Sequence, residues 1–265
     1  MEQFRPTSFK ILPPVVKNIL IINGLFYLGT LTFQSAFKID LTDILGMHYF
    51  ASENFKPFQI VTYMFMHGSF GHIFFNMFAV WMFGNVLESF WGPKKFLTYY
   101  MITGIGAILI QMLITYIQLH PIQQAISIFS NDQSQNNFNI AANQMNFFFT
   151  DQNFADFNSH RISAMEFLET GLRNRVNTTT IGASGAVFGV LLAFGMMFPN
   201  SLIYVYFAIP IKAKWFVIIY GAIELYTGIL NNPSDNVAHF AHLGGMLFGL
   251  ILIMYWNKRI KGKYF

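Results

Sequence analysis

Two residues with the chemistry of a hydrolase lie in segments apolar enough to span a membrane. Ser184 stands in the run Gly182-Ala183-Ser184-Gly185, and His242 stands in Ala241-His242-Leu243-Gly244-Gly245. A polar or ionisable side chain is costly inside a bilayer and therefore marks a functional site by default. A histidine base is what activates the weak hydroxyl of serine for nucleophilic attack. The pair predicts serine–histidine catalysis inside a membrane.

Small residues surround both candidates. Gly182 and Gly185 flank Ser184, and Gly245 follows His242. Small residues let membrane helices approach closely, which would bring the serine hydroxyl within hydrogen-bond reach of the imidazole. Ordinary helix packing, with Ser184 bonded back to its own helix, is the alternative interpretation. The run is not the Gly-x-Ser-x-Gly elbow of α/β-hydrolases, because Ala186 occupies the last glycine position.

His72 and Asn76 lie four residues apart and therefore share one face of a helix. Acyl transfer needs donors aimed at the developing oxyanion. These two side chains are candidate oxyanion donors, with the backbone amide of Ser184 as a third. A polar helix end in the membrane interface is the alternative.

No carboxylate lies close in sequence to Ser184 or His242, so we predict a dyad and not a triad. Phe188 is one turn from Ser184, and its ring could stack on the imidazole and hold its orientation. It could equally be a phenylalanine of the core or the lipid face. Glu224 has no partner that the sequence identifies, and it could be protonated or paired across helices.

His239 shares a face with His242 and is expected to support it through a hydrogen bond near the water-exposed end of the last span. The histidines His67, His72, His239 and His242 could be imagined as a metal site, but the sequence has neither a His-Glu-x-x-His pair nor a cysteine. We expect no metal. Glu88 is expected to satisfy hydrogen-bond donors near the end of its span.

The composition predicts a membrane protein. The chain has 265 residues, of which 54% are hydrophobic and 11% are charged, whereas soluble domains contain about 25% charged residues. The absence of cysteine excludes a disulfide scaffold and a cysteine nucleophile. The net charge of +4 does not indicate nucleic-acid binding, because the basic residues form no single face.

The first segment lacks the short apolar stretch and cleavage site of a signal peptide, so we expect the first helix to be retained. The chain reads as one all-α membrane domain over residues 1–265, with six spans at about 20 apolar residues each. The spans are predicted at 15–37, 72–90, 96–119, 181–198, 216–230 and 237–256. With both termini cytoplasmic, most of the 16 lysines and arginines face inward, as the positive-inside rule requires.

Residues 120–180 form an insertion rich in Asn, Gln and Phe between the third and fourth spans. Long connections without regular structure tend to be functional or disordered. We expect an external loop that partly follows the membrane surface, with a weak helical pattern at 161–176. A lid that contacts substrate is the alternative.

Several motifs in one order resemble the rhomboid family of intramembrane serine proteases. These are His67-Gly68-Ser69-Phe70-Gly71-His72-Ile73-Phe74-Phe75-Asn76, Glu88, Gly182-Ala183-Ser184-Gly185 and Ala241-His242-Leu243-Gly244-Gly245. The resemblance implies a six-helix bundle in which Ser184 is the nucleophile and His242 the base. It also implies that His72 and Asn76 assist the oxyanion hole. The implied partners are transmembrane protein substrates, cleaved near the outer membrane face, and the lipid bilayer, with no metal, cofactor or nucleotide.

The sequence departs from many members of that family at Phe58-Gln59, where they carry Trp-Arg, and at Val237, where they often have glycine. Two other classes stay open. A non-catalytic rhomboid-like protein that escorts membrane helices typically lacks the serine or the histidine, and both are present here. Transporters often show repeated halves, and the sequence shows none. The minimal six-span form without long cytosolic domains favours a bacterial cytoplasmic membrane, and an organelle membrane is the alternative.

Overall fold

The computed structural model describes residues 12–145, 163–205, 208–230, 235 and 237–261, with side chains to residue 257. The chain divides into two compact units. Unit 1 comprises Met1–Met47, Pro57–Gln111 and Thr180–Phe265, and unit 2 comprises His48–Lys56 and Met112–Thr179. The two units are described separately.

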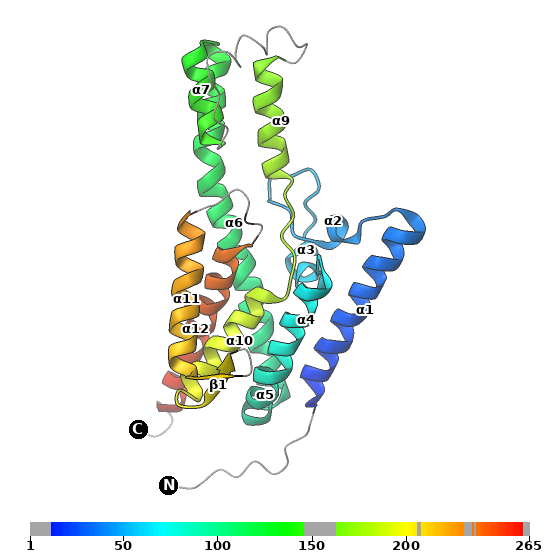
Figure 1. Ribbon diagram of the computed structural model, residues 1–265, viewed down its shortest axis with the longest axis vertical. Helices are drawn as coiled ribbons and strands as arrows, with labels where there is room; N and C mark the ends of the chain where they lie inside the picture. The colour runs from blue at the N-terminus through cyan, green and yellow to red at the C-terminus, as the bar shows by residue number, and fades with distance from the viewer. Residues whose placement is uncertain (1–11, 146–162, 206–207, 231–234, 236, 262–265) are drawn as a thin grey trace. The chain divides into compact units, whose positions relative to one another are not determined.

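Unit 1 is a helical bundle with one small hairpin (Figure 1). Its elements are α1 (Pro14–Phe37), α2 (Leu41–Leu45), α3 (Gln59–Thr62), η1 (Tyr63–Phe65), α4 (Phe70–Ala79), the π-helical turn η2 (Val80–Gly84), α5 (Asn85–Trp91), the first part of α6 (Pro93–Asn131), α10 (Ser184–Met197), β1 (Leu202–Val205), β2 (Ile209–Lys212), α11 (Ala213–Leu230) and α12 (His239–Lys261). The helices α4, η2 and α5 run on without a break over Phe70–Trp91.

The expected helical membrane bundle is confirmed, with one difference in the spans. Within the described residues, five helices are long and apolar enough to cross a membrane: Pro14–Phe37, Phe70–Trp91, Pro93–Asn131, Ala213–Leu230 and His239–Asn257. The fourth predicted span is instead a shorter apolar helix, Ser184–Met197, of 14 residues. It is short because a glycine turn precedes Ser184, so the helix starts three residues later than its apolar sequence suggests.

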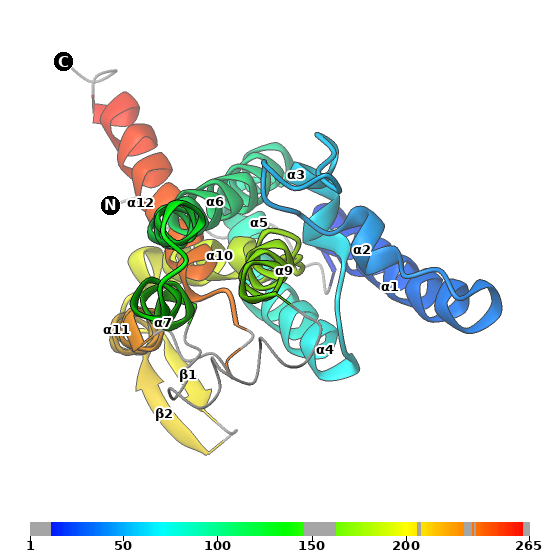
Figure 2. The same ribbon diagram turned by 90° about the horizontal axis from the view of Figure 1, so that it is seen from above.

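Helix α10 lies in the middle of unit 1, with α1 and α11 at its outer edges (Figure 2). Ten of its 14 residues are buried, as expected for a helix that is hydrophobic on every side. Glycines let its neighbours come close. A Cβ added to Gly189 would lie 2.6 Å from Thr103 Cβ, and one added to Gly244 would lie 3.1 Å from Ala107 Cα.

The outer faces of the bundle are apolar and exposed, as a lipid environment requires. On α1 the exposed side chains include Leu25 and Leu28, and on α11 they include Ile218, Ile223 and Ile229. A surface of this kind has no favourable contact with water, whereas hydrocarbon tails match it. The protein is therefore a multi-pass membrane protein.

Glu88 on α5 forms hydrogen bonds with the start of α1. Its carboxylate is 2% exposed and accepts hydrogen bonds from the amides of Val15 at 3.0 Å and Val16 at 2.8 Å. These amides have no carbonyl partner in the preceding turn, and the positive end of the helix dipole favours an anion there. The prediction that Glu88 satisfies local donors is confirmed.

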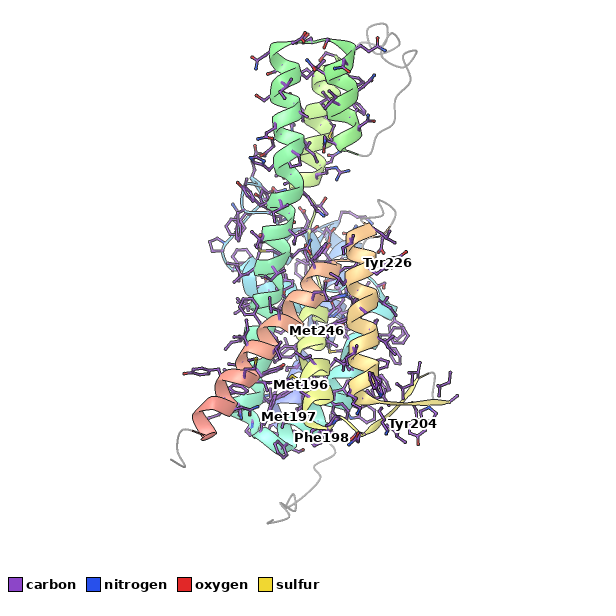
Figure 3. All side chains as sticks on the ribbon, turned by 90° about the vertical axis from the view of Figure 1, so that its left-hand side faces the viewer. Met196, Met197, Phe198, Tyr204, Tyr226 and Met246 are labelled. Atoms are coloured by element: carbon purple, nitrogen blue, oxygen red, sulfur yellow. The ribbon has the colours of Figure 1, made fainter. Side chains whose placement is uncertain are left out.

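The antiparallel hairpin β1–β2 joins α10 to α11 and pairs Leu202 with Lys212 and Val205 with Ile209. Figure 3 shows Tyr204 on this hairpin, and its side chain is exposed. The hairpin was not predicted, because the residues between the predicted spans 181–198 and 216–230 are themselves apolar and show no clear strand signal. Local pairing overrides that helical pattern here.

Unit 2 is built on three helices around a core of its own. They are the last part of α6, α7 (Gln135–Gln144) and α9 (Ala164–Val176). The core contains Leu119, Ile122, Ala125, Ile126, Phe129, Phe138, Ala141, Ala142, Met145 and Leu168. The expectation of a loop without regular structure is therefore wrong for the described part of this segment, and residues 146–162 lie outside it. Its position along the membrane surface stays a prediction.

Local signals explain the two new helices. Ser163 caps α9 by accepting a hydrogen bond from Glu166 N at 3.1 Å, and Ser134 begins α7 in the same way. The Ser-x-x-Glu pattern of Ser163 and Glu166 is a helix start signal, whereas Ser134 is followed by Asn137 at that spacing. At the far end of α9, Arg175 donates a hydrogen bond to the Met145 carbonyl at 2.7 Å and so ties α9 to the end of α7. The weak helical pattern at 161–176 was the correct signal, and apolar residues at helical spacing supply the core.

Candidate active site

Ser184 is the first residue of α10, not a turn inside it as the sequence suggested. The preceding turn depends on Gly182, whose φ of +123° is one that other residues rarely adopt. Gly182 also donates its amide to the Tyr63 carbonyl at 2.9 Å. At the start of the helix, the Ser184 amide has no carbonyl partner one turn earlier. The hydroxyl and this amide therefore stand together at a helix N-terminus.

The hydroxyl of Ser184 lies 2.8 Å from Nε2 of His242. His242 is in the first turn of α12 and is largely buried. The approach of the two helices requires glycine at position 245, because a Cβ on Gly245 would collide with the backbone carbonyl of Gly185. The small-residue faces that the sequence marked are thus the faces that bring serine and histidine together.

Phe188 lies one turn beyond Ser184 on α10, and its ring stacks on the His242 imidazole. The ring centroids are 4.2 Å apart and the planes are 6° from parallel. On its other side Phe188 meets the ring of Tyr220, at 5.0 Å between centroids. The imidazole is therefore held by an aromatic face as well as by its hydrogen bonds.

His72 approaches Ser184 from α4, and Asn76 lies one turn further along the same helix. A Cβ added to Gly182 would lie 2.7 Å from His72 Nε2 and 3.6 Å from Ser184 Oγ, so both atoms border the same small space. Asn76 is 6% exposed, and its Nδ2 donor has no hydrogen-bond partner among the described residues. A buried amide donor left unsatisfied costs free energy. Such a donor is available to a ligand atom.

His67 lies in the loop before α4 and supports His72. Its side chain is 1% exposed, and its ring packs edge-on against that of His72 with centroids 4.8 Å apart. Burial lowers the pKa of His67 to about 4. Neither ring nitrogen reaches a partner at hydrogen-bond geometry within the described chain, although the Phe65 carbonyl is near enough to oppose the effect of burial. His67 is therefore neutral near pH 7.

Glu224 is the residue whose partner the sequence did not identify, and of the two alternatives left open for it the structure shows pairing across helices. It lies on α11, is 5% exposed, and its Oε2 atom is 2.8 Å from Nδ1 of His242. The same oxygen is 2.7 Å from Nδ1 of His239. The signal was present in the sequence, since a carboxylate in an apolar span implies a partner. The partner could not be identified from the sequence, because Glu224 and His242 are brought together only when α11 packs beside α12.

His239 continues the network outward. Its Nε2 atom lies 3.0 Å from Oδ2 of Asp235, and Thr227 Oγ1 lies 3.1 Å from its Nδ1. The pKa of the Asp235 carboxyl is lowered, mainly by its hydrogen bond with His239. Because both ring nitrogens face carboxylate oxygens, the doubly protonated ring satisfies both contacts.

A metal ion has one candidate set among the described residues. Glu224, His239 and His242 each offer a ligand atom, and these atoms lie within 4.8 Å of one another. The set differs from the one imagined from the sequence, because His67 and His72 are not part of it. The carboxylate oxygen already lies at hydrogen-bond distance from both nitrogens, so the contacts are satisfied without an ion.

Comparison with known proteins decides the family. The chain matches the Rhomboid domain over residues 54–119 and 160–259, which is more than half of its length. The chain belongs to the rhomboid family. The matched residues include the motifs around Ser184 and His242, and membership supports intramembrane protease activity in general terms.

Two curated rhomboid relatives are similar to the chain. RHOMBOID-like protein 12, mitochondrial, of Arabidopsis thaliana is 23% identical over 80% of the chain and 50% of the relative. An uncharacterized mitochondrial rhomboid protein of Schizosaccharomyces pombe is 31% identical over 31% of the chain and 22% of the relative. The chain thus spans at most half the length of these relatives. Both names are mitochondrial, which does not fit the prediction of a bacterial cytoplasmic membrane.

Proposed function

We propose that this rhomboid is an intramembrane serine endopeptidase that cuts transmembrane segments of other membrane proteins. The observation that carries the proposal is the 2.8 Å contact between Ser184 Oγ and His242 Nε2 in a bundle of membrane helices. A serine hydroxyl at hydrogen-bond distance from an imidazole nitrogen has the base that its attack requires. Family membership supports the same activity.

The reaction follows from that geometry. Ser184 Oγ bonds to the scissile carbonyl carbon while its proton passes to His242 Nε2. When the tetrahedral intermediate collapses, the C–N bond breaks and His242 gives the proton to the leaving amine. A water molecule then attacks the ester, gives its proton to His242, and displaces Ser184 Oγ, which recovers the proton.

The oxyanion has three candidate donors, one at the start of α10 and two on α4. They are the Ser184 amide at the start of α10, the Asn76 Nδ2 group and the His72 side chain. Fixed donors of this kind stabilise charge that develops in the transition state without reorganisation at the moment of reaction. Phe188 supports the geometry by fixing the plane of the His242 ring.

The substrate side and the location belong to the same proposal. The lysines of the α5–α6 junction and of the hairpin before α11 favour one face of the membrane as the inner face. Ser184 begins α10, whereas the hairpin follows the other end of that helix. Cleavage is therefore expected near the outer boundary of the substrate helix. The names of the two relatives favour a mitochondrial membrane.

A fluorophosphonate probe tests the proposal directly, since it reacts with serines that a base activates. We expect the purified protein in detergent to be labelled, and the Ser184→Ala and His242→Ala variants to remain unlabelled while folded. Ser201→Ala is the matched control, because Ser201 lies after the other end of α10, and it should be labelled like the wild type. A folded wild-type protein that is not labelled, or labelling that survives in Ser184→Ala, contradicts the proposal.

A second experiment tests the substrate class. The protein is reconstituted in liposomes with single-pass membrane proteins, and the cut position is read by mass spectrometry. We expect cuts near the outer end of the substrate helix that disappear with Ser184→Ala. Cleavage confined to soluble regions of these proteins would exclude an intramembrane site.

A further inference from the structure

Glu224 is a buried carboxylate on an otherwise apolar helix. Most of α11 presents apolar side chains to the outside, and the Glu224 side chain turns inward, at 5% exposure. Burying a charge is costly unless it is paired and hydrogen-bonded. Two imidazole nitrogens meet that need, since Oε2 lies 2.8 Å from His242 Nδ1 and 2.7 Å from His239 Nδ1.

The hydrogen bonds of His242 assign its neutral tautomer. Its Nε2 faces the Ser184 hydroxyl and its Nδ1 faces Glu224, which as a carboxylate only accepts. The ring therefore donates from Nδ1 and accepts at Nε2. This is the one neutral form in which Nε2 can take the serine proton. Glu224 selects the tautomer and fixes the ring at the atom opposite the reacting one.

We propose that Glu224 is the positioning residue of a Ser184–His242–Glu224 triad, which rests on the function proposed above and replaces the dyad expected from the sequence. When His242 takes the serine proton, the ring becomes positive beside a carboxylate that is already in place. A fixed carboxylate stabilises the imidazolium and needs no proton of its own.

The surrounding charges fit that role. His239 bridges Glu224 and Asp235, so one imidazolium lies between two carboxylates and the set carries one net negative charge. The proton that His242 takes from Ser184 places a positive charge beside Glu224, at the buried end of this set, whereas Asp235 lies at its exposed end. Opposite charges next to one another are stabilised in a low-dielectric site, where an uncompensated charge is costly.

The triad also spans three helices. Ser184 lies on α10, His242 on α12 and Glu224 on α11, and these helices are neighbours in Figures 1 and 2. Figure 3 marks Tyr226 on α11 and Met246 on α12. The orientation of the base therefore depends on how α11 packs against α12. A displacement of α11 would take the carboxylate away from Nδ1.

Two other interpretations of Glu224 give different results. As a purely structural tie, it would hold α11 to α12 through His239 alone. As a metal ligand, it would act with His239 and His242. In both cases His239 matters as much as Glu224, whereas a triad needs the Glu224–His242 contact first.

The test compares Glu224→Gln, Glu224→Asp and His239→Gln in the full chain. Readouts are the fluorophosphonate labelling rate and the kcat and KM for a transmembrane substrate. We expect Glu224→Gln to lower kcat and labelling by about 100-fold or more with little change in KM, since loss of the orienting acid in serine proteases acts on kcat. Glu224→Asp, which keeps the charge, should recover part of that loss, and His239→Gln should lose less than Glu224→Gln.

A double-mutant comparison separates orientation from folding. On the His242→Ala background, Glu224→Gln should cause no further loss of the residual rate of substrate hydrolysis, measured over long incubation, because residues that act as a unit are not additive. Glu88→Gln is the matched control, since Glu88 is another buried carboxylate that binds backbone amides far from the site. It should lower thermal stability without lowering the labelling rate of the folded fraction.

Several results would overturn the triad. Near-normal kcat in a folded Glu224→Gln protein does so, and so does an equal further loss on the His242→Ala background. Stoichiometric metal in the purified protein that disappears with either Glu224→Gln or His239→Gln would establish the metal site instead. Failure of the wild type itself to be labelled at a base-activated serine is a different result, because it contradicts the proposed function and not the triad alone.

Discussion

The Phe188 ring lies nearly parallel to the His242 imidazole, with 4.2 Å between the centroids and 6° between the planes. Stacking of this kind fixes rotation of the imidazole about its side-chain bonds, which hydrogen bonds at Nδ1 and Nε2 leave partly free. Phe188 lies on the same helix as Ser184, so the hydroxyl and the surface that orients its base move together.

We expect Phe188→Leu to lower kcat by up to about tenfold. An aromatic contact contributes about 0.5–1.5 kcal/mol beyond its buried area, and about 1.4 kcal/mol is tenfold in rate. Leucine keeps most of the volume and removes the flat face. Phe194→Leu, at another aromatic contact of α10 with Phe83, is the control for general packing. If Phe188→Leu and Phe194→Leu lower kcat equally, Phe188 has no special role in orienting the imidazole.

Gly182→Ala should inactivate the enzyme while leaving it folded. The φ of +123° strains any side chain there, and a Cβ would lie 2.7 Å from His72 Nε2 in the space beside Ser184 Oγ. We expect labelling of Ser184 to fall by about 100-fold, as for loss of an oxyanion donor. Gly24→Ala is the control, since a Cβ on Gly24 meets nothing within 4 Å. Normal labelling of Gly182→Ala would show that the space is not used.

Asn76 tests the oxyanion donors. Its buried Nδ2 group has no partner among the described residues, so we assign it to the transition state. Asn76→Ala should lower kcat by about 100-fold with little change in thermal stability. Asn76→Asp, which keeps the shape and removes the donor, should do the same. Asn23→Ala serves for comparison, because the Asn23 amide bonds to its own helix at Ile19. An unchanged kcat in a folded Asn76→Ala protein would contradict the role of Asn76 as an oxyanion donor.

The helical bundle was predictable because apolar length alone indicates a membrane span. Spacing inside one helix was equally informative, since it placed Phe188 beside Ser184 and Asn76 beside His72. Both inferences depend only on the period of an α-helix. The length of α6 was not predictable in this way, because the helix continues through Pro121 to Asn131 with polar residues that belong to unit 2.

Contacts between helices could not be read from the sequence. Glu224 and His242 lie 18 residues apart on different helices, so no periodicity joins them. The nearest clue was energetic, namely that a carboxylate in an apolar span needs a partner. The position of Ser184 at the first residue of α10 was missed for a similar reason. The unusual backbone of Gly182 ends the apolar run earlier than hydropathy indicates.

The pH dependence of stability should depend on His67. The unfolded residue, with a pKa of about 6.5, takes up a proton as the pH falls below that value, whereas the folded residue, with a pKa of about 4, does not. The unfolded state then binds more protons, so the free energy of unfolding falls as the pH drops from about 6.5 toward about 4.

We expect His67→Gln to weaken this dependence by about 1 to 2 kcal/mol between pH 6.5 and 5, since one pKa unit corresponds to about 1.4 kcal/mol. Thermal denaturation in detergent at a series of pH values measures it. His120→Gln is the control, because His120 is exposed. Equal slopes for wild type and His67→Gln would show that His67 is protonated in the folded state or that another group dominates.

Unit 2 provides a test of substrate selection. Phe138 is fully buried in the core of that unit and meets Phe129 at 5.9 Å between centroids. Phe138→Ala should cost about 3–5 kcal/mol in that core and raise hydrogen exchange in α7 and α9. Labelling of Ser184 should stay within about twofold of the wild type, a change of about 0.4 kcal/mol in activation free energy. The described side chains that contact Ser184 and His242 all belong to unit 1.

The same variant decides between the two roles considered for the insertion. If the insertion selects substrates as a lid, loosening its core should change which members of a panel of transmembrane substrates are cut, while the labelling rate stays constant. If it has no such role, the wild type and Phe138→Ala should cut the same members at the same positions. Reduced labelling together with a changed pattern would instead indicate that unit 2 supports the fold of the site.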